Sequence, residues 1–284
     1  MRVDQAPDPG QHVRPAGDDV SEGDLLIRRG TVLGARHIGL LASVGRATVV
    51  TRPRPRVVIL STGSELRDPG QELGHDSIYD GNSYMLAAAV LRAGAVPHRV
   101  GIVTDDPGRF RETLHRELVG ADLVVTSGGV SQGDYDIVKE ALRSQGVWFG
   151  PVAMQPGKPQ GFGLIGDERT PIVTLPGNSV SAYVSFEMFV LPAIRTLMGL
   201  APVSRPLLDA RLTEAMSSPR GRRQFMRGMA GTDAQGRYVE PVGGPGSHLI
   251  GALAEANCLI VVPESVTALE KGDSAQVLML DSDF

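Results

Sequence analysis

The chain has 284 residues, which is enough for two domains that each bury a hydrophobic core. Its formal net charge at pH 7 is −4, and it has no long stretch rich in lysine and arginine, so it lacks the basic footprint of a nucleic-acid-binding protein. We therefore expect a small-molecule partner and no nucleic acid.

The single cysteine and the hydropathy pattern exclude further classes of protein. One cysteine, Cys258 in the run "CLIVV", excludes an internal disulfide and a cysteine-rich metal site, and we expect it to be a small buried hydrophobe. The first ten residues lack the apolar core of a signal peptide. The most apolar helical stretch, residues 180–198, is interrupted by Glu187 and Arg195. We expect a soluble cytoplasmic protein without a membrane partner.

Residues 1–53 come first along the chain. The sequence predicts a short helix at "ARHIGLLASVG" and β-structure at "RATVVT". A segment of this length cannot bury a core of its own. It is therefore either a small appendage of another domain or part of a larger domain. Residues 52–56, "RPRPR", are expected to be a linker because two prolines disfavour both helix and central strand.

Residues 54–200 alternate short apolar runs with helical patterns. The expected strands are "VVIL", "HRVGIV", "ADLVVT" and "PIVTL". The expected helices are "SYMLAAAVLRAG", "GRFRETLHREL", "DIVKEALRSQG" and a long helix that begins near Val180. Strand, loop and helix repeated four times predict an α/β layer structure with a mostly parallel sheet. Asp106 is expected to cap the second helix, with Pro107 in its first turn.

Residues 201–284 lose this alternation. Short extended pieces are separated by "SSPRG", "TDAQG", "GGPGS" and "EKGD". This pattern predicts a small, mostly β domain at the C-terminal end.

The loops that follow the four strands are expected to meet at one edge, because parallel strands all end on the same side of their sheet. These loops are "STGSE", "TDD", "SGGVSQGDYD" and "LPGNS", and "QPGKPQGFG" joins the last two. Glycine-rich loops and helix N-termini favour an anion, whereas several carboxylates would repel it unless a hard cation lies among them. The sequence therefore predicts a phosphate or oxyanion pocket organised by Mg²⁺. Mn²⁺ and Zn²⁺ remain alternatives.

Each loop also has an ordinary structural interpretation. Glycine-rich turns are usually only turns. Asp105 and Asp106 could be helix caps, and Glu65 could be a solvated surface charge. The convergence of the loops at one edge is what favours a functional site.

Several motifs carry a specific resemblance. "STGSEL", "IYDGNSYML", "GIVTDDP", "TSGGVSQGDYDIVK", "PGKPQGFG" and "LPGNSVSAYVSFEMFV" together resemble the molybdopterin molybdenumtransferase family, which includes MoeA and the gephyrin E domain. "GRRQFMRG", "GPGSHLIGALAEANCLIVVPE" and "KGDSAQVLML" are similar to its C-terminal β domain. The resemblance implies a three-layer molybdopterin-binding domain, a small C-terminal β domain and, in residues 1–53, the returning half of a split β-rich domain.

The resemblance also implies an activity and a set of residues. The family inserts molybdate into adenylylated molybdopterin with release of AMP, using Mg²⁺. Glu65, Asp105 and Asp136 correspond to its acidic active-site positions, and we expect them to be catalytic and to coordinate the metal. The residues expected to contact molybdopterin are Thr62, Gly63, Ser127, Gly128, Gly129, Gly133, Asp134, Gly157, Lys158, Pro176, Gly177, Asn178 and Ser247.

Departures from the family pattern accompany the resemblance. Family members commonly carry lysine where this chain has Pro151 and Gln155, and they begin well upstream, so slower molybdate insertion than in a full-length relative is expected. Arg222, Arg223 and Arg227 either extend positive potential or form a solvated face. The resemblance further implies a homodimer, and molybdopterin adenylyltransferase or recipient molybdoenzymes as protein partners.

Two other functions stay open. Molybdopterin adenylyltransferases share the α/β domain but lack the C-terminal β domain. A non-catalytic module that binds molybdopterin or acts as a scaffold is the second alternative.

Overall fold

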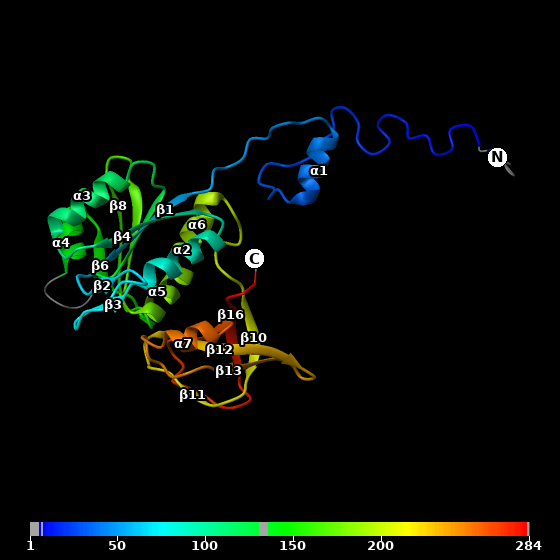
Figure 1. Ribbon diagram of the computed structural model, residues 1–284. Coiled ribbons are helices and arrows are strands. Elements are labelled where there is room, and N and C mark those ends of the chain that lie inside the picture. Colours follow the sequence, from blue (N-terminus) through cyan, green and yellow to red (C-terminus); the bar gives the residue numbers. More distant parts are fainter. Residues whose placement is uncertain (1–5, 7, 131–135, 283) are drawn as a thin grey trace. The chain divides into compact units, whose positions relative to one another are not determined.

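The computed structural model describes residues 6, 8–130, 136–282 and 284 of the chain. The chain divides into two compact units, residues 1–51 and 52–284. Each unit is described by itself, with the element labels of Figure 1.

The N-terminal unit has one helix among its described residues, α1 (Ala35–Ser43). This confirms the helix expected there. The β-structure expected at residues 46–51 is wrong, since no described residue of this unit lies in a strand. A strand needs a neighbour to satisfy its backbone N–H and C=O groups, and the described part of the unit offers none. None of its described residues is buried, so these residues form no core.

A six-stranded sheet is the centre of the second unit, with strand order β4-β1-β5-β9-β8-β6. The strands are β1 (Arg56–Thr62), β4 (Val96–Val103), β5 (Leu123–Ser127), β6 (Trp148–Pro151), β8 (Pro159–Ile165) and β9 (Thr170–Leu175). The first four in the order are parallel, as predicted, and β8 and β6 add an antiparallel edge. The sequence does not predict this edge, because prolines and glycines interrupt the alternation of both strands.

Helices cover both faces of this sheet (Figure 1). They are α2 (Asn82–Arg92), α3 (Pro107–Glu117), α4 (Ile137–Arg143), α5 (Ser179–Ser185), the π-helical turn η1 (Phe186–Val190) and α6 (Leu191–Met198). Val57 and Ile59 pack with α2, η1 and α6 on one face. Val58 and Leu60 pack with α3 and α4 on the other. Successive strand residues point to opposite faces, so the run "VVIL" serves both layers and the three-layer prediction is confirmed.

The cap predicted for α3 is confirmed. Asp106 accepts a hydrogen bond from the backbone N–H of Arg109 at 2.7 Å, and Pro107 lies in the first turn. This arrangement satisfies a donor that the helix itself leaves free.

Residues Ser179–Met198 form a helical stretch long and apolar enough to cross a membrane by length and composition alone. However, 61% of that stretch's most apolar window is buried inside the fold. Glu187 within it pairs with Arg205 at 2.7 Å. These contacts are those of a core helix.

A second six-stranded sheet contains most of the C-terminal segment, in the order β13-β10-β16-β14-β12-β7. Its strands are β7 (Met154–Gln155), β10 (Leu207–Leu212), β12 (Arg223–Asp233), β13 (Gly236–Pro241), β14 (Cys258–Val262) and β16 (Ser274–Met279). β13 also pairs with β12, which gives the sheet a barrel-like form. The predicted C-terminal β domain is therefore confirmed, and β7 joins it from the segment between β6 and β8.

Smaller elements complete the unit. They are β2 (Leu66–Arg67), β3 (Ile78–Tyr79), β11 (Met216–Ser217), β15 (Ala268–Leu269) and α7 (Ile250–Glu255). β2 and β3 pair in parallel between β1 and α2.

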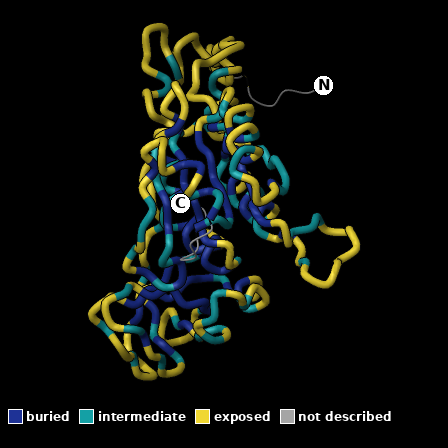
Figure 2. Tube along the Cα trace, turned by 90° about the vertical axis from the view of Figure 1, so that its left-hand side faces the viewer, coloured by how far each residue is buried: buried dark blue, intermediate teal, exposed yellow. Residues whose placement is uncertain are grey.

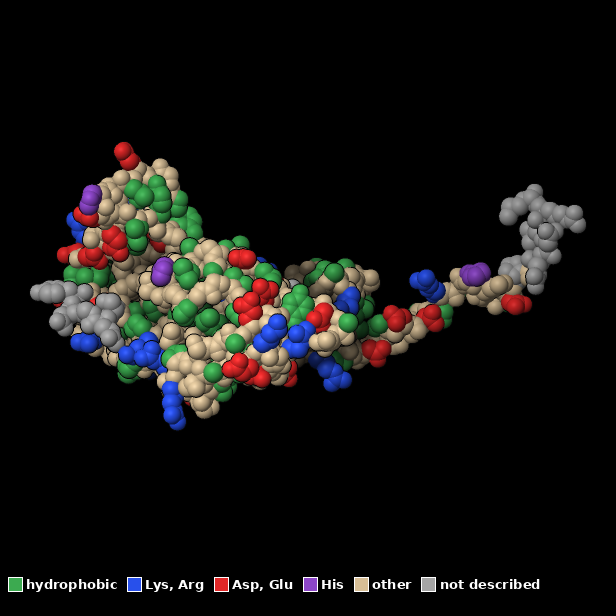
Figure 3. Space-filling view, turned by 90° about the horizontal axis from the view of Figure 1, so that it is seen from below, with side chains coloured by type: hydrophobic (Ala, Val, Ile, Leu, Met, Phe, Trp, Pro, Cys, Tyr) green, Lys and Arg blue, Asp and Glu red, His purple; other side chains and the backbone are tan. Residues whose placement is uncertain are grey.

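Burial follows the strands and the inward helix faces, whereas most loop residues away from the cavity are exposed (Figure 2). Cys258 is fully buried, as expected, and burial raises the pKa of its thiol to about 12. Acidic and basic side chains are interspersed over the face shown in Figure 3, in keeping with the small net charge.

Candidate active site

A cavity of about 740 Å³ lies where β1, β5 and β9 end. Its walls come from the loops that leave these strands, from the β2–β3 segment and from the starts of α2 and α4. The loops expected at one edge therefore do meet there, at the carboxyl ends of parallel strands.

Glycine allows three of these loops to approach one another. Gly128 has a φ of +91°, and a Cβ built on it would lie 2.8 Å from the carbonyl oxygen of Thr62. Its N–H donates to the carbonyl of Leu175 at 3.1 Å, and a Cβ on Gly177 would lie 3.6 Å from its Cα. A side chain at position 128 would strain the backbone and push the loops after β1 and β5 apart.

The start of α4 packs against the next glycine. Gly129 has a φ of +70°, and a Cβ there would lie 2.2 Å from Cγ2 of Val138 and 3.1 Å from Oδ1 of Asp136. Asp136 Oδ1 accepts the N–H of Lys139 at 3.3 Å, which caps α4. The Asp136 carboxylate is almost wholly buried and has Lys139 Nζ 3.8 Å from Oδ2. Asp136 therefore combines a cap with a place in the cavity wall.

Glu65 and Asp105 bring two more carboxylates to the cavity. Asp105 Oδ2 accepts the N–H of Ser64 at 2.8 Å, so it joins the loop after β4 to the loop after β1. The Glu65 carboxylate lies over Gly63, where a Cβ would be 2.5 Å from Oε2. Asp106 is the helix cap, and Asp105 is not.

The carboxylates do not by themselves form a closed metal site. Among the described residues, no three His, Cys, Asp or Glu side chains lie close enough together to hold an ion. Their oxygen donors nevertheless suit Mg²⁺, which usually takes one or two carboxylates together with ligand oxygens and water. The residues fit a metal whose coordination a substrate completes.

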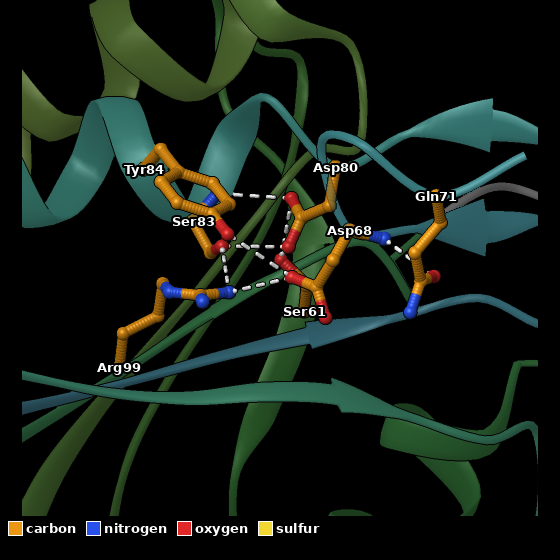
Figure 4. Close-up of polar contacts among 7 residues, drawn as sticks. All are labelled: Ser61, Asp68, Gln71, Asp80, Ser83, Tyr84 and Arg99. Carbon is orange, nitrogen blue, oxygen red and sulfur yellow. Dashed lines mark hydrogen bonds and ion pairs between the residues drawn. The ribbon is translucent and has the colours of Figure 1, made fainter.

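Asp80 is a cavity residue that the sequence analysis does not single out. It is 1% exposed and accepts hydrogen bonds from Ser61 Oγ at 3.1 Å, from Ser83 N–H at 3.0 Å and from Ser83 Oγ at 2.6 Å (Figure 4). The signal was present in "DGNS", where Asp precedes Ser by three residues at a helix start, as helix caps do.

Asn82 is the second such residue. Its Nδ2 donates to Ser127 Oγ at 2.9 Å and to the carbonyl oxygen of Gly177 at 2.6 Å. One side chain at the start of α2 thus links the loops after β5 and β9. No local pattern predicts this contact, because Asn82 is 45 residues from Ser127 and 95 from Gly177.

The structure brings most of the predicted site together. The predicted residues that line the cavity are Thr62, Gly63, Glu65, Asp105, Ser127, Gly128, Gly129, Asp136, Pro176, Gly177 and Asn178. Gly133 and Asp134 lie outside the described residues. Gly157, Lys158 and Ser247 do not line it. Ser247 is linked to it, since Asn178 Nδ2 donates to Ser247 Oγ at 3.0 Å.

The arginines of the "GRRQFMRG" motif divide into different environments. Arg222 Nη1 donates to Gln155 Oε1 at 3.5 Å, and Arg223 pairs with Glu264 at 3.3 Å. Arg227 is 1% exposed, so the interpretation of all three as a solvated face is wrong for it. It donates to the carbonyl of Gly244, and burial lowers the pKa of its guanidinium.

Family models match three parts of the chain. A probable molybdopterin binding domain matches residues 58–196, the MoeA C-terminal region (domain IV) matches residues 209–280, and the MoeA N-terminal region (domain I and II) matches residues 1–45.

Molybdopterin molybdenumtransferase 2 of Mycobacterium tuberculosis is 45% identical over 98% of this chain and 69% of its own length. The corresponding transferase of Haemophilus influenzae is 35% identical over 96% of this chain and 68% of its own length. A crystal structure of the molybdopterin biosynthesis MoeA protein from Pyrococcus horikosii superposes with a TM-score of 0.79 at 29% identity, over 94% of this chain and 65% of that one. The chain spans about two thirds of the length of these relatives, and it belongs to the molybdopterin molybdenumtransferase family, a family of transferases.

Proposed function

We propose that this chain inserts molybdate into adenylylated molybdopterin and releases AMP. One observation carries the proposal: glycine loops from three parallel strands and three carboxylates, Glu65, Asp105 and Asp136, line a single cavity. A phosphorylated substrate and an oxyanion need donors, and a phosphoryl group that leaves needs its charge neutralised. This cavity offers groups of both kinds.

The glycine loops are proposed to hold the phosphate and pterin groups. Gly128 and Gly177 leave backbone partly exposed at the cavity because they have no side chain to cover it, whereas Gly63 is buried beneath the Glu65 carboxylate. Thr62 and Ser127 add hydroxyl groups at the ends of β1 and β5. Asn82 keeps Ser127 and the Gly177 loop at a fixed separation, so these donors are preorganised.

The carboxylates are proposed to bind the metal ion and to orient the reacting oxygen. One or two of the carboxylates Glu65, Asp105 and Asp136 would hold Mg²⁺ together with substrate oxygens and water, and the ion would supply charge neutralisation at the phosphoryl group. Glu65 and Asp105 are both exposed at the cavity wall, but Asp105 accepts a backbone N–H, so Glu65 is the carboxylate proposed to orient a water molecule or a molybdate oxygen. Asp136 and Asp105 are fixed by backbone N–H groups and keep their positions during turnover.

The N-terminal unit supports a proposed homodimer. None of its described residues is buried, although Leu25, Val32 and Ile38 are large apolar residues with more than half of their surface exposed. Such a segment gains stability by covering its apolar residues with a second copy. We place the protein in the cytoplasm, where molybdopterin adenylyltransferase and recipient molybdoenzymes would be its partners.

Glu65→Gln and Asp136→Asn test the proposal. The chain is supplied with Mg²⁺, molybdate and adenylylated molybdopterin, and AMP release is measured. Each variant is expected to lose activity about a hundredfold or more, the scale seen when an electrostatic group is removed from an active site. Glu72→Gln, at an exposed position that does not line the cavity, is the control and should match the wild type. Wild-type turnover in both site variants would overturn the assignment.

The same assay separates the alternatives. A molybdopterin adenylyltransferase would consume ATP and form the adenylate, and the match of residues 209–280 to the MoeA C-terminal region argues against this function. A non-catalytic module would bind molybdopterin without releasing AMP. Gln155 and Pro151 motivate this second alternative, since neither carries a positive charge.

A further inference from the structure

We propose that Arg99 is a positioning residue of the cavity, and that it holds the segment of residues 64–81 where this segment supplies Glu65 and Asp80 to the wall. The proposal deepens the proposed function and relies on it only for the identity of the substrate. Arg99 lies on β4 and is not one of the residues that line the cavity.

Arg99 contacts two separate parts of the chain at once. Its Nη1 donates to Asp68 Oδ1 at 3.1 Å and to Ser83 Oγ at 3.4 Å. Its guanidinium carbon lies 4.0 Å from the centroid of the Tyr84 ring, and Tyr84 Oη donates to Asp68 Oδ1 at 3.2 Å. Figure 4 shows these groups around the guanidinium. One side chain therefore joins the segment after β2 to the first turn of α2.

The contact with Asp68 reaches the cavity through the β2–β3 ladder. The N–H of Ile78 donates to the carbonyl of Glu65 at 2.9 Å, and the N–H of Asp80 donates to the carbonyl of Arg67 at 2.8 Å. Asp68 follows β2 directly. Holding Asp68 therefore holds a short ladder that has Glu65 at one end and Asp80 at the other.

The contact with Ser83 reaches the cavity by a second route. Ser83 Oγ accepts from Arg99 and donates to Asp80 Oδ2 at 2.6 Å. Asp80 also accepts from Ser61 at the end of β1. The buried carboxylate of Asp80 is thus fixed between β1 and α2, and Arg99 orients the hydroxyl that holds it.

The segment between these contacts is held by polar contacts rather than by packing. Gln71 Oε1 accepts the N–H of Asp68 at 3.1 Å, and the carbonyl of Gln71 accepts from Tyr79 Oη at 2.9 Å. Residues 68–77 are all described and form neither helix nor strand, and residues 69–76 are all exposed. A segment with few buried apolar contacts has low local stability, so the loss of one polar contact at its base should be felt along it. The ion pair and the cation–π contact of Arg99 are weak one by one, but here they act at the base of the segment.

The test uses Arg99→Met in the full chain, with Arg92→Met as a matched control. Arg92 lies in the last turn of α2 and pairs with Asp281 at 3.1 Å, the same distance as Arg99 and Asp68, but it does not contact the segment. Amide hydrogen exchange is measured over residues 64–81, and molybdopterin binding is measured by titration. Exchange is expected to quicken there in Arg99→Met only, with a dissociation constant for molybdopterin raised about fivefold.

Further variants separate positioning from a general loss of stability. Arg99→Lys keeps a positive charge for Asp68 and should recover most of the exchange protection. Asp68→Asn should reproduce Arg99→Met from the other partner, and it provides the test if Arg99→Met does not fold. Unchanged exchange over residues 64–81, equal quickening in Arg92→Met, or faster exchange with unaltered molybdopterin binding would each overturn the proposal.

The readouts also keep the two proposals apart. If the wild-type chain binds molybdopterin but releases no AMP, the proposed function fails and the exchange and binding results still decide the role of Arg99. If AMP is released and Arg99→Met lowers kcat about tenfold at unchanged thermal stability relative to Arg92→Met, both proposals gain support.

Discussion

The parallel strands and the loops that leave their carboxyl ends lie side by side in the sequence but differ in nearly every physical property. Val57–Leu60 are fully buried and apolar, and they pack on both helix layers. Five residues later, Glu65 is an exposed carboxylate beside Gly63, whose φ is +153°. The side chains of these strands pack in the core, whereas several side chains of the loops line the cavity.

This difference indicates that stability and chemistry are largely separable in the α/β part of the chain. Substitutions within strands should change the free energy of unfolding and leave molybdopterin binding intact. Substitutions of the exposed side chains of the cavity loops should weaken binding and leave the free energy of unfolding nearly unchanged. Each prediction below is a way to test that separation.

Ile59→Ala should have the largest effect on stability. Ile59 is fully buried in β1 and packs in the core with α2 and α6, so its truncation leaves a cavity. The free energy of unfolding is expected to fall by about 2–5 kcal/mol, and by about 0.5–1.5 kcal/mol for Ile59→Val. Denaturant titration measures this change. If molybdopterin binding weakens in proportion in the folded protein, strand packing and ligand binding are not separable here.

Gly128→Ala and Gly146→Ala form a matched pair. Both glycines have positive φ, +91° and +83°, but a Cβ on Gly146 would meet nothing within 4 Å. Gly146→Ala should therefore cost only the strain of the left-handed region, about 1–2 kcal/mol. Gly128→Ala adds a clash with the carbonyl of Thr62 and should also weaken molybdopterin binding at least tenfold. Equal binding in the two variants would show that the loops do not need their close approach.

Much of the fold could be predicted from the sequence because it depends on residue patterns that are local in the chain. The apolar runs, the loop glycines and the Asp106–Pro107 helix start all act over a few residues. The antiparallel edge β6–β8 and the pairing of β7 with β12 could not be predicted in the same way. They depend on contacts between distant segments, and their prolines and glycines interrupt the alternation of apolar and polar residues that is typical of a strand.

The residues of the candidate site also differ in whether a local pattern or a distant contact reveals them. The glycine loops and Glu65, Asp105 and Asp136 are visible as motifs, and topology alone predicts that they meet. Asp80 and Asn82 are less visible, because their importance comes from partners in other loops. The absence of a three-ligand cluster among the described side chains is also a property of geometry, which no motif contains.

Asp106→Ala tests whether a polar residue close to the cavity can be purely structural. Asp106 is next to Asp105 in sequence but caps α3 and does not line the cavity. Its loss should lower the free energy of unfolding by about 1 kcal/mol, and Asp106→Asn, which can still cap, should lower it less. AMP release should be unchanged in both. If AMP release falls strongly while the free energy of unfolding falls only by this amount, Asp106 takes part in the reaction.

Leu41→Ala should have the smallest effect on the second unit and extends the comparison to the N-terminal unit. Leu41 and Ile59 are apolar residues of similar size, but Leu41 belongs to a unit without one buried residue among those described. Removing its side chain therefore opens no cavity, and the free energy of unfolding of residues 52–284 should change by about 0.5 kcal/mol or less. If a second copy covers the apolar residues of this unit, the same substitution should weaken the dimer, and light scattering over a range of concentrations would show more monomer than in the wild type. A wild-type chain that is monomeric at micromolar concentration, or a dimer indifferent to Leu41→Ala and to Ile38→Ala, would contradict the proposed interface. A fall in stability as large as that of Ile59→Ala would instead mean that Leu41 is packed within its own chain in solution.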